Sequence, residues 1–336
     1  MAGSGKAHLR ADGDVLLSVD DLTVEFPAGN GRKVHAVSGI SFDVVRGETL
    51  GLVGESGCGK STTGRAILQL PPPTSGSVTL SGTDLTGLSD EEMRRKRTDV
   101  QMIFQDPISS LNPRRRIGEV VAEPLRVWGP KKADEQWELV SKILDAVGID
   151  PDVARFKRPH EFSGGQCQRI SIARALVMQP DLIICDEPVS ALDVSVQAQI
   201  LNMLEDLKKT YGLTLVFIAH DLAVVKNISD RVAVMYLGKL CEVADSDEMY
   251  RNPAHPYTEL LLGSSPIPDP LAPLDDTVHT DVELPSPLSP PSGCRFRTRC
   301  PLADDICEQE EPQMQQVSED HYVACHHPLV EIAASA

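Results

Sequence analysis

The chain has 336 residues, of which 41% are hydrophobic, and this size suits one large domain together with a smaller one. No apolar run reaches the ~20 residues of a membrane-spanning helix, and the amino-terminal residues lack the apolar segment of a secretory signal. These features exclude an integral membrane protein, so we expect a chain of the cytosol whose role at any membrane depends on a partner.

The net charge of -17 is unevenly distributed along the chain. Residues 245–336 carry 17 acidic and 4 basic side chains, whereas residues 1–244 carry 32 and 28. An acidic carboxy-terminal region argues against a tail that binds nucleic acid, because phosphate contacts need Lys and Arg. We therefore expect no nucleic-acid partner and interpret most of these acids as solvated surface.

The amino-terminal part of the chain predicts β-structure. Residues 1–14 are small and polar, and we expect them to be disordered. Alternating hydrophobic residues predict strands over 15–26 and 35–45. They form an antiparallel piece that leads into a buried strand over 49–53 and is continued by a short strand over 76–82.

A glycine-rich loop follows the strand over 49–53 and precedes a helix predicted over 62–69. Its sequence fits the phosphate-loop pattern G-x-x-x-x-G-K-[ST], in which backbone N–H groups and a helix N-terminus face a phosphate. Lys60 would reach the β- and γ-phosphates, and the Ser61 hydroxyl would bind Mg²⁺. The alternative is a chance glycine turn, which the flanking strand and helix disfavour. The predicted nucleotide-binding residues here are Gly54, Glu55, Ser56, Gly57, Cys58, Gly59, Lys60, Ser61 and Thr62.

Strands alternate with helices through the rest of the first 245 residues, which predicts a parallel sheet and an α/β fold. The predicted strands cover 100–104, 182–185, 213–219 and 231–237. The predicted helices cover 89–98, several segments within 114–160, and 166–178, 197–211 and 222–228. Residues 264–291 contain eight prolines and predict a linker or an extended strap.

Two further segments carry chemistry. The strand over 182–185 is followed by Asp186 and Glu187, which places acids at the carboxyl edge of the sheet, where ligands sit. Asp186 would hold Mg²⁺ and Glu187 would polarise an attacking water. An exposed acidic turn is the alternative. The second segment, Ser163, Gly164, Gly165 and Gln166, precedes a helix and could bring backbone N–H groups to an anion, although an ordinary helix cap explains it locally.

Four cysteines fall within 32 residues near the carboxy terminus, with the spacing C-x5-C-x6-C-x17-C. In a reducing compartment such a group favours metal binding over disulfides. The thiolates could hold a [4Fe–4S] cluster or structural zinc, although the first gaps are wide for zinc. His326 and His327 keep a mixed ligand set open. The residues are Cys294, Cys300, Cys307 and Cys325.

Six motifs occur in the order typical of one family, and over about residues 15–245 the chain resembles the nucleotide-binding subunit of ATP-binding-cassette (ABC) transporters. They are Walker A at 54–61, the Q-loop at Gln105, the signature at 163–166, Walker B at 182–187, the D-loop at 190–193 and the switch histidine His220. One departure is Phe162, where the family commonly has Leu.

Other segments resemble the dipeptide and oligopeptide importer subgroup: 105–107, 110–114, 252–258 and the cysteine-bearing tail. The resemblance implies a P-loop NTPase cassette with a parallel-sheet core, an antiparallel β piece and a helical subdomain. The ATPase domain would span 15–245, with the helical subdomain at about 106–178, and a carboxy-terminal extension would span 246–336.

The resemblance also implies residue roles. Glu187 would be the base for the hydrolytic water, and His220 would contact the γ-phosphate. Gln105 would sense Mg²⁺ and the membrane partner, so that Ser61, Gln105 and Asp186 form the Mg²⁺ shell. Ser163 and its neighbours in 163–166 would contact the nucleotide of a second cassette in trans. Phe26 is the candidate to stack on adenine, with a strand-core aromatic as the alternative.

The implied function is ATP hydrolysis that energises a membrane importer of peptides through closure of a cassette dimer. The partners would be a second ABC ATPase subunit, with a heterodimer favoured, two permease subunits and an extracytoplasmic binding protein, at the cytoplasmic face of the membrane. The resemblance favours the iron–sulfur interpretation of the cysteines. Alternatives are a nickel or glutathione importer, a soluble cassette ATPase in DNA repair or translation, and a degenerate cassette.

Overall fold

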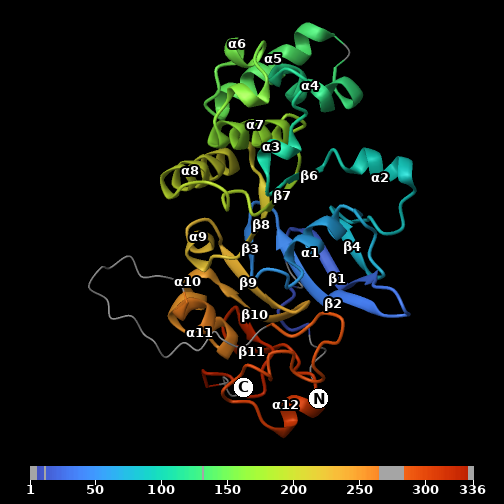
Figure 1. The fold of residues 1–336 in the computed structure, drawn as a ribbon, viewed down its shortest axis with the longest axis vertical. Coiled ribbons are helices and arrows are strands. Elements are labelled where there is room, and N and C mark those ends of the chain that lie inside the picture. Colours follow the sequence, from blue (N-terminus) through green and yellow to red (C-terminus); the bar gives the residue numbers. More distant parts are fainter. Residues whose placement is uncertain (1–5, 11–12, 131, 265–283, 332–336) are drawn as a thin grey trace. The chain divides into compact units, whose positions relative to one another are not determined.

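The computed structural model describes residues 6–10, 13–130, 132–264 and 284–331 (Figure 1). The chain packs into two units, which are described separately. The first consists of Met1–Val45, Thr49–Gly87 and Ala219–Ala336, and the second of Arg46–Glu48 and Leu88–Ile218. Within the described residues, no helix is long and apolar enough to cross a membrane.

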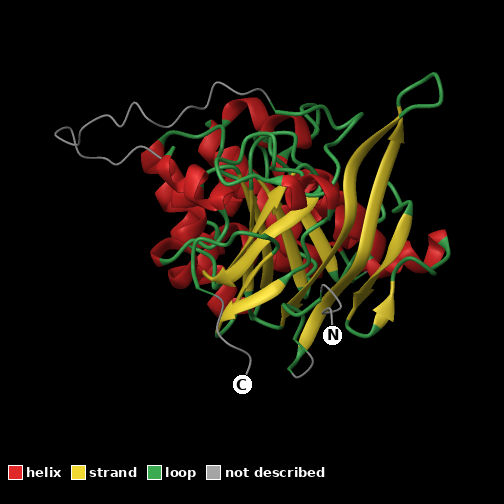
Figure 2. Ribbon diagram, turned by 90° about the horizontal axis from the view of Figure 1, so that it is seen from below, coloured by secondary structure: helices red, strands yellow, loops and turns green. Residues whose placement is uncertain are grey.

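The first unit contains a four-stranded antiparallel sheet with the order β2-β1-β4-β5. Figure 2 draws the strands of the protein in yellow. On one side of β1, Val19 lies opposite Phe42, and on the other it lies opposite Val78. These three side chains are at most 2% exposed, so the sheet has a buried face. The antiparallel piece expected from the sequence is confirmed. Its strands are β1 (Val15–Pro27), β2 (Lys33–Val45), β4 (Ser75–Leu80) and β5 (Thr83–Asp84).

Residues 6–10 do not show the disorder expected of residues 1–14. Lys6 pairs with Asp20 and Asp21, and Arg10 Nε lies 2.6 Å from Asp43 Oδ2. His8 is 4% exposed, and its Nε2 lies 2.6 Å from the Ser41 carbonyl oxygen. Polar composition indicated disorder, but these contacts fix the segment against β1 and β2.

The first unit also contains the strands that flank the phosphate loop, in the order β11-β12-β10-β9-β3. β3 and β9 are parallel, and the remaining pairs are antiparallel. These strands are β3 (Thr49–Val53), β9 (Arg231–Tyr236), β10 (Lys239–Asp245), β11 (Gln315–Ser318) and β12 (His321–Val323). The helices are α1 (Lys60–Ile67), α9 (Leu222–Lys226), α10 (Ser246–Arg251), α11 (Pro256–Gly263) and α12 (Asp305–Gln309).

The carboxy-terminal extension has more core than its proline-rich composition predicts. β12 pairs with β10, and the side chains of Ala254, Val317, Val323 and Cys325 form a buried cluster. A second cluster joins Tyr257 to Tyr236 and Phe296, with ring centroids 4.7 and 5.3 Å apart. The extension therefore shares the core of the first unit. Most of the proline-rich segment 264–291 lies outside the described residues.

A buried carboxylate joins the extension to β10. Glu242 is 0% exposed, and its Oε1 accepts hydrogen bonds from Ala254 N at 2.8 Å and His321 Nε2 at 2.7 Å. Its Oε2 accepts a third from His255 N at 2.8 Å. A buried carboxylate is stable only when its oxygens are paired, so this network fixes the segments before α11 and in β12.

His255, which caps α11, is expected to make the protein acid-sensitive. Burial lowers its pKa from 6.5 to about 4, although Glu242 acts in the opposite direction. The unfolded chain therefore takes up the proton first, and stability falls as the pH drops from 6.5 towards 4. Between pH 7 and 5 this costs about 2 kcal/mol of unfolding free energy, measurable by urea titration.

The variant His255→Asn should lose less stability than the wild type over the same pH interval. Asn can still cap the helix, where His255 Nδ1 now accepts from Tyr257 N at 3.0 Å. His160→Asn removes an exposed histidine and serves as the control. An equal acid response in wild type and His255→Asn would contradict the assignment.

The second unit combines a parallel sheet with helices. Its strands β6 (Val100–Ile103), β7 (Leu182–Asp186) and β8 (Thr214–Ala219) have the order β8-β7-β6, and the five residues of β7 are all buried. The parallel pairing confirms the α/β prediction. The helices are α2 (Asp90–Lys96), α3 (Pro107–Ser110), α4 (Ile117–Trp128), α5 (Ala133–Ala146), α6 (Pro151–Ala154), α7 (Gly164–Leu176) and α8 (Val194–Tyr211), with a 3₁₀ turn η1 (Pro159–Glu161).

Candidate nucleotide-binding site

The phosphate loop joins β3 to α1 in a backbone conformation that requires glycine. Gly54 has φ 152°, and a Cβ there would lie 2.1 Å from the carbonyl oxygen of Met235. Gly59 has φ 110°, and a Cβ there would lie 2.2 Å from the carbonyl oxygen of Ala36. The two glycines therefore let the loop pack closely against β2 and β9. They also let the backbone N–H groups at the start of α1 turn towards the space where a phosphate would bind.

Lys60, the first residue of α1, is held inside this loop. It is 4% exposed, and its Nζ donates to the carbonyl oxygens of Gly54 at 2.6 Å and Glu55 at 3.0 Å. A third contact, 3.8 Å to Cys58 Sγ, uses a weak acceptor. A phosphate oxygen is a better acceptor than a thiol, so this geometry suits a loop that receives a phosphate. Burial raises the pKa of Cys58, which fits a packing role without chemistry.

The sequence did not predict two residues that contact this loop. The Tyr257 hydroxyl accepts from Glu55 N at 2.9 Å, and Arg299 makes two hydrogen bonds with the Glu55 carboxylate at 2.7 and 2.9 Å. Tyr257 lies in the segment 252–258 and Arg299 precedes Cys300, so both were in motifs already singled out. Only the fold shows that they reach Glu55.

The second unit brings Gln105 and the acids after β7 together. Asp186, the last residue of β7, is 1% exposed. Glu187 has φ 47°, an uncommon backbone conformation for a residue with a side chain, and its N–H donates to Ile218 O at 3.0 Å. Gln105 Nε2 donates to Glu187 Oε2 at 3.0 Å. The strained turn thus aims the glutamate towards the Q-loop side chain, and strain of this kind is concentrated at functional sites.

The signature segment forms the N-terminus of α7. Ser163 is its N-cap: its Oγ accepts from Gln166 N at 3.3 Å, and Gln166 Oε1 accepts from Ser163 N at 2.9 Å. A Cβ on Gly165 would lie 2.7 Å from Val196 Cγ1, so glycine lets α7 pack against α8. The helix-cap alternative describes the local geometry. Ser163, Gly164 and Gln166 are nevertheless exposed and accessible to another molecule.

The D-loop and the two remaining predicted residues occupy surface positions. Asp193 caps α8 by accepting from Val196 N at 3.0 Å. The hydrogen bond that its carboxylate accepts from the Ser195 hydroxyl at 2.7 Å, together with that from Val196 N, holds its pKa below the ordinary value. His220 directly follows β8 and is exposed. Phe26 lies opposite Val34 near the end of the β1–β2 hairpin and is 36% exposed. The strand-core alternative for Phe26 is wrong, because its side chain is not in the core.

The motif residues divide between the two units. The phosphate loop, Phe26 and His220 belong to the first, whereas Gln105, 163–166, Asp186 and Glu187 belong to the second.

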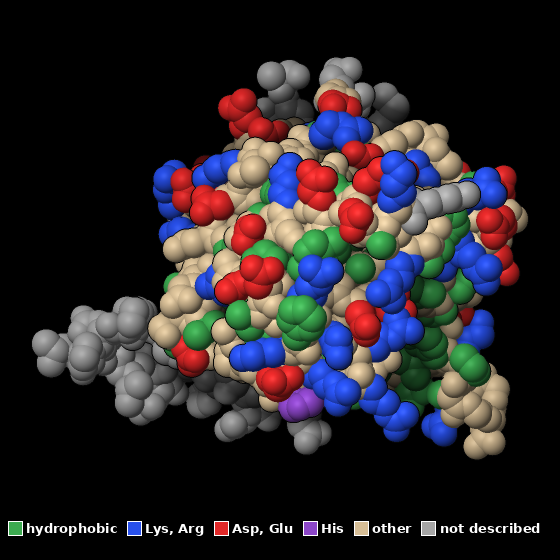
Figure 3. Space-filling view, turned by 90° about the horizontal axis from the view of Figure 1, so that it is seen from above, with side chains coloured by type: hydrophobic (Ala, Val, Ile, Leu, Met, Phe, Trp, Pro, Cys, Tyr) green, Lys and Arg blue, Asp and Glu red, His purple; other side chains and the backbone are tan. Residues whose placement is uncertain are grey.

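On the face drawn in Figure 3, acidic and basic side chains are interspersed, with hydrophobic side chains between them.

The four clustered cysteines lie in one region of the first unit, and none forms a disulfide. Burial, with a smaller contribution from the nearby Cys294, Cys300 and Cys307, raises the pKa of Cys325 to about 12. Cys294 N also donates to Cys307 O at 2.8 Å, and His327 N donates to Cys325 Sγ at 3.4 Å. The four residues are therefore neighbours, and thiolates are the ligands that soft metals and iron–sulfur clusters take.

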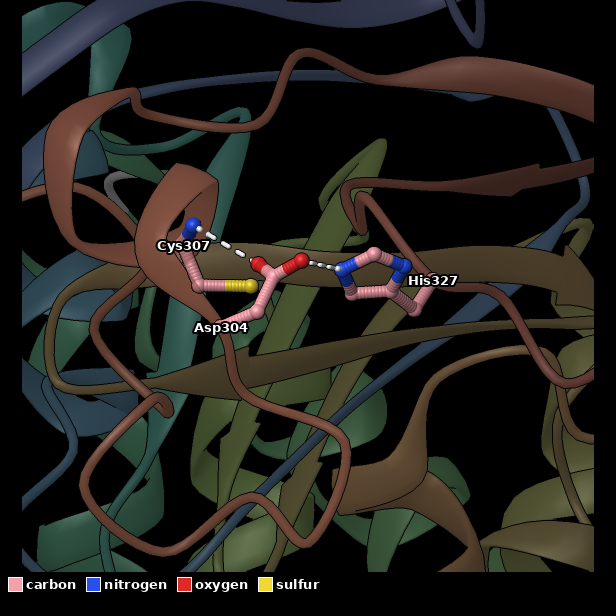
Figure 4. Close-up of side chains that lie close together, drawn as sticks. All are labelled: Asp304, Cys307 and His327. Atoms are coloured by element: carbon pink, nitrogen blue, oxygen red, sulfur yellow. Dashed lines mark hydrogen bonds and ion pairs between the residues drawn. The ribbon is translucent and has the colours of Figure 1, made fainter.

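The tightest ligand group among the described residues is different from the expected four cysteines. Asp304, Cys307 and His327 bring a carboxylate oxygen, a sulfur and a ring nitrogen within 4.8 Å of one another (Figure 4). Asp304 caps α12 through Cys307 N and lies 3.0 Å from His327 Nε2. The contact with Asp304 therefore brings His327 close to Cys307. The sequence analysis did not single out Asp304 as a ligand.

Comparison with known proteins gives the class of this chain. The family described as ABC transporter matches residues 37–190. The dimeric structure of the ATP-binding cassette MJ0796 bound to ADP and Pi aligns with a TM-score of 0.63 and 27% identity, covering 69% of this chain and 99% of that one. CbiO1 from Clostridium perfringens aligns with a TM-score of 0.62 and 29% identity, covering 70% and 91%. The chain is an ATP-binding-cassette ATPase, which confirms the predicted fold and enzyme class.

The particular family follows from closer relatives. The oligopeptide transport ATP-binding protein OppF of Escherichia coli (strain K12) is 53% identical over 321 residues, covering 93% of this chain and 96% of that protein. The putative oligopeptide transport ATP-binding protein YkfD of Bacillus subtilis (strain 168) is 52% identical over 315 residues, covering 93% and 95%. The family described as oligopeptide/dipeptide transporter, C-terminal region, matches residues 241–307. The chain belongs to the oligopeptide-type ATP-binding proteins of ABC transporters, as its motifs indicated.

Proposed function

We propose that the chain is the ATP-hydrolysing subunit of an ABC importer for oligopeptides. The observation that carries this proposal is the hydrogen bond between Gln105 and Glu187, in a chain whose phosphate loop is also intact. It supports a cassette built for hydrolysis rather than a degenerate one. The peptide substrate is supported by the names of the relatives and by the match of the carboxy-terminal region.

Each motif residue has a role in this proposal. Backbone N–H groups of 54–59, with Lys60 and Thr62, bind the phosphates, and Phe26 stacks on adenine. Ser61, Gln105 and Asp186 hold the Mg²⁺ that accompanies ATP, which neutralises phosphate charge. Glu187 accepts the proton of the attacking water, and His220 contacts the γ-phosphate. The signature residues 163–166, of which Ser163, Gly164 and Gln166 are exposed, complete the site of a second cassette.

The assembly in this proposal has a second cassette, two permease subunits and an extracytoplasmic binding protein. We propose that the second cassette is a different chain and that the complex lies at the cytoplasmic face of the membrane, with this subunit attached peripherally. ATP favours the closed dimer by its higher affinity for that state, and hydrolysis removes the bias. We also propose the division into an ATPase domain at 15–245, with a helical subdomain at about 106–178, and an extension at 246–336.

The cysteines of the extension are proposed to hold a [4Fe–4S] cluster. The proximity of the four thiols supports it. A zinc ion bound by Asp304, Cys307 and His327 is the second candidate, supported by their 4.8 Å spacing. The shared aromatic and aliphatic core already anchors the extension. We therefore expect the iron–sulfur cluster or the zinc ion to fix local geometry rather than to drive folding.

Iron analysis should distinguish the two candidates. Protein purified without oxygen should contain about four iron atoms per chain and absorb visible light. Cys300→Ser should remove most of the iron because it deletes one thiolate ligand, whereas Cys58→Ser, outside the cluster, should not. One zinc per chain that is lost in His327→Ala but kept in Cys300→Ser would exclude the cluster and establish the mixed site.

The proposed function is tested by purifying the chain from membranes of its own cell with the proteins bound to it. We expect two permeases and a second cassette, together with ATPase activity stimulated by the peptide-loaded binding protein. Stimulation by nickel chelates or glutathione instead of peptides would overturn the peptide assignment. Recovery with DNA-repair or ribosomal proteins and without a permease would overturn the transport role.

A further inference from the structure

The segment that carries the cysteines reaches the phosphate loop through a single side chain. Arg299 lies next to Cys300, and 244 residues separate it from Glu55 in the chain. Its Nη1 and Nη2 donate to the two carboxylate oxygens of Glu55 at 2.7 and 2.9 Å. This bidentate geometry is the strongest arrangement that an arginine forms with a carboxylate, and it fixes the orientation of both groups.

The surroundings of Arg299 make this pair rigid. Its side chain is 5% exposed and that of Glu55 is 24% exposed, so water screens the pair little. The guanidinium carbon lies 5.8 Å from the centre of the Tyr236 ring and 5.9 Å from that of Phe296. Tyr236 and Phe296 are each at most 1% exposed and pack edge to face. The arginine is therefore held by the core before it meets the loop.

Every polar group of Glu55 is engaged in this arrangement. Its N–H donates to the Tyr257 hydroxyl, its carboxylate accepts from Arg299, and its carbonyl oxygen accepts from Lys60 Nζ. The carbonyl of Gly54, one peptide earlier, is the other main acceptor for Lys60. The contacts to the extension thus fix the positions of the Gly54 and Glu55 carbonyl oxygens. These two oxygens in turn position the ammonium group of Lys60, which would bind the phosphate.

We propose that Arg299 is a positioning residue of the nucleotide site and that the carboxy-terminal extension sets the affinity of this cassette for ATP. Arg299 touches no nucleotide in this role. It acts through Glu55, with Tyr257 as a second support. The proposal gives a function to the Tyr257 and Arg299 segments that the general cassette mechanism does not use, and it rests on the proposed ATPase function.

The test measures binding of Mg²⁺ with the non-hydrolysable analogue AMP-PNP to the full chain by calorimetry. Arg299→Gln and Glu55→Gln should each raise the Kd by about tenfold, because each removes the bidentate pair. The double variant should be no weaker than either single variant, since both delete the same interaction. In hydrolysis assays the KM for ATP should rise while kcat stays within about twofold, because Glu187 is untouched.

Arg297→Gln is the matched control. It removes an arginine from the same segment, but one paired with Glu308 at 3.3 Å rather than with the phosphate loop. It should leave the Kd within about twofold of the wild type, as expected for a partly solvated pair. If Arg299→Gln does not fold, Glu55→Gln carries the test, because it leaves the buried arginine in place.

The result that overturns the proposal is a Kd for Arg299→Gln and Glu55→Gln equal to that of Arg297→Gln, even if their thermal stability falls. The proposal would also be overturned if the fold increases in Kd of the two single variants multiplied in the double variant, because the two residues would then act independently. A wild-type chain that does not bind the analogue would refute the proposed ATPase function itself. The two failures are therefore distinguishable.

Discussion

Glu187→Gln should reduce kcat for ATP hydrolysis by about 10²–10⁴-fold, the usual contribution of a general base. The amide cannot take the proton of the attacking water, but it has nearly the shape of the carboxylate. Its oxygen can still accept the hydrogen bond that Gln105 Nε2 now gives Glu187 Oε2 at 3.0 Å. The turn at φ 47° should therefore persist, and ATP should bind but not turn over.

Rapid-quench hydrolysis and filter binding of ATP measure the two properties separately. Glu205→Gln is the control, because it removes a glutamate of α8 that pairs with Lys209 at 3.1 Å on the same unit. The control should hydrolyse ATP at the wild-type rate. Undiminished hydrolysis by Glu187→Gln would show that another group activates the water.

Ser163→Arg should disable the nucleotide bound to the partner cassette and leave the nucleotide held by Lys60 in place. Ser163 is exposed at the N-terminus of α7, where its hydroxyl can donate to an anion on another molecule. An arginine there fills the space in front of the helix and removes the cap. We expect photolabelling of the partner by azido-ATP to fall at least about tenfold, as expected when anion contacts are lost.

Lys60→Ala is the reciprocal variant, and it should abolish labelling of this chain instead. The assay uses the assembled transporter, in which the two cassettes separate on a gel. Thermal unfolding of Ser163→Arg checks the cost of the lost cap, about 1 kcal/mol. Loss of label from this chain in Ser163→Arg would show that the signature acts in cis, and the two-cassette site would have to be abandoned.

The strands and helices were largely predictable, because buried strands and capped helices leave local patterns. Residues 182–185 of β7 are a continuous apolar run, and their burial follows directly from that composition. The helices α7 and α8 begin two and three residues earlier than predicted, since their caps Ser163 and Asp193 precede the apolar residues used to locate them. The strands β10, β11 and β12 were missed. The strands β11 and β12 have only four and three residues, and β12 joins the sheet by pairing with β10, which is remote in the chain.

The candidate site likewise has parts that the sequence predicts and parts that only the fold shows. The phosphate loop and the acids after β7 are contiguous motifs that residue spacing identified, whereas the signature at 163–166 was assigned only through the family resemblance. The contact of Gln105 with Glu187 joins residues 82 positions apart, and no local pattern encodes it. The role of Asp304 beside Cys307 and His327 likewise depends on where the turn at α12 places a carboxylate.

The sequence by itself determined a nucleotide-binding site, because glycines, a lysine and acids at fixed spacings meet the chemistry of a phosphate. Its resemblance to the peptide-importer subgroup, in segments such as 252–258, indicated the particular class of cassette. Only the tertiary structure decided which residues of the carboxy-terminal extension contact the phosphate loop. A bidentate ion pair between Arg299 and Glu55, and a buried carboxylate at Glu242, arise from packing of segments far apart in the chain. Their strength comes from low exposure and fixed geometry, which composition and spacing do not specify.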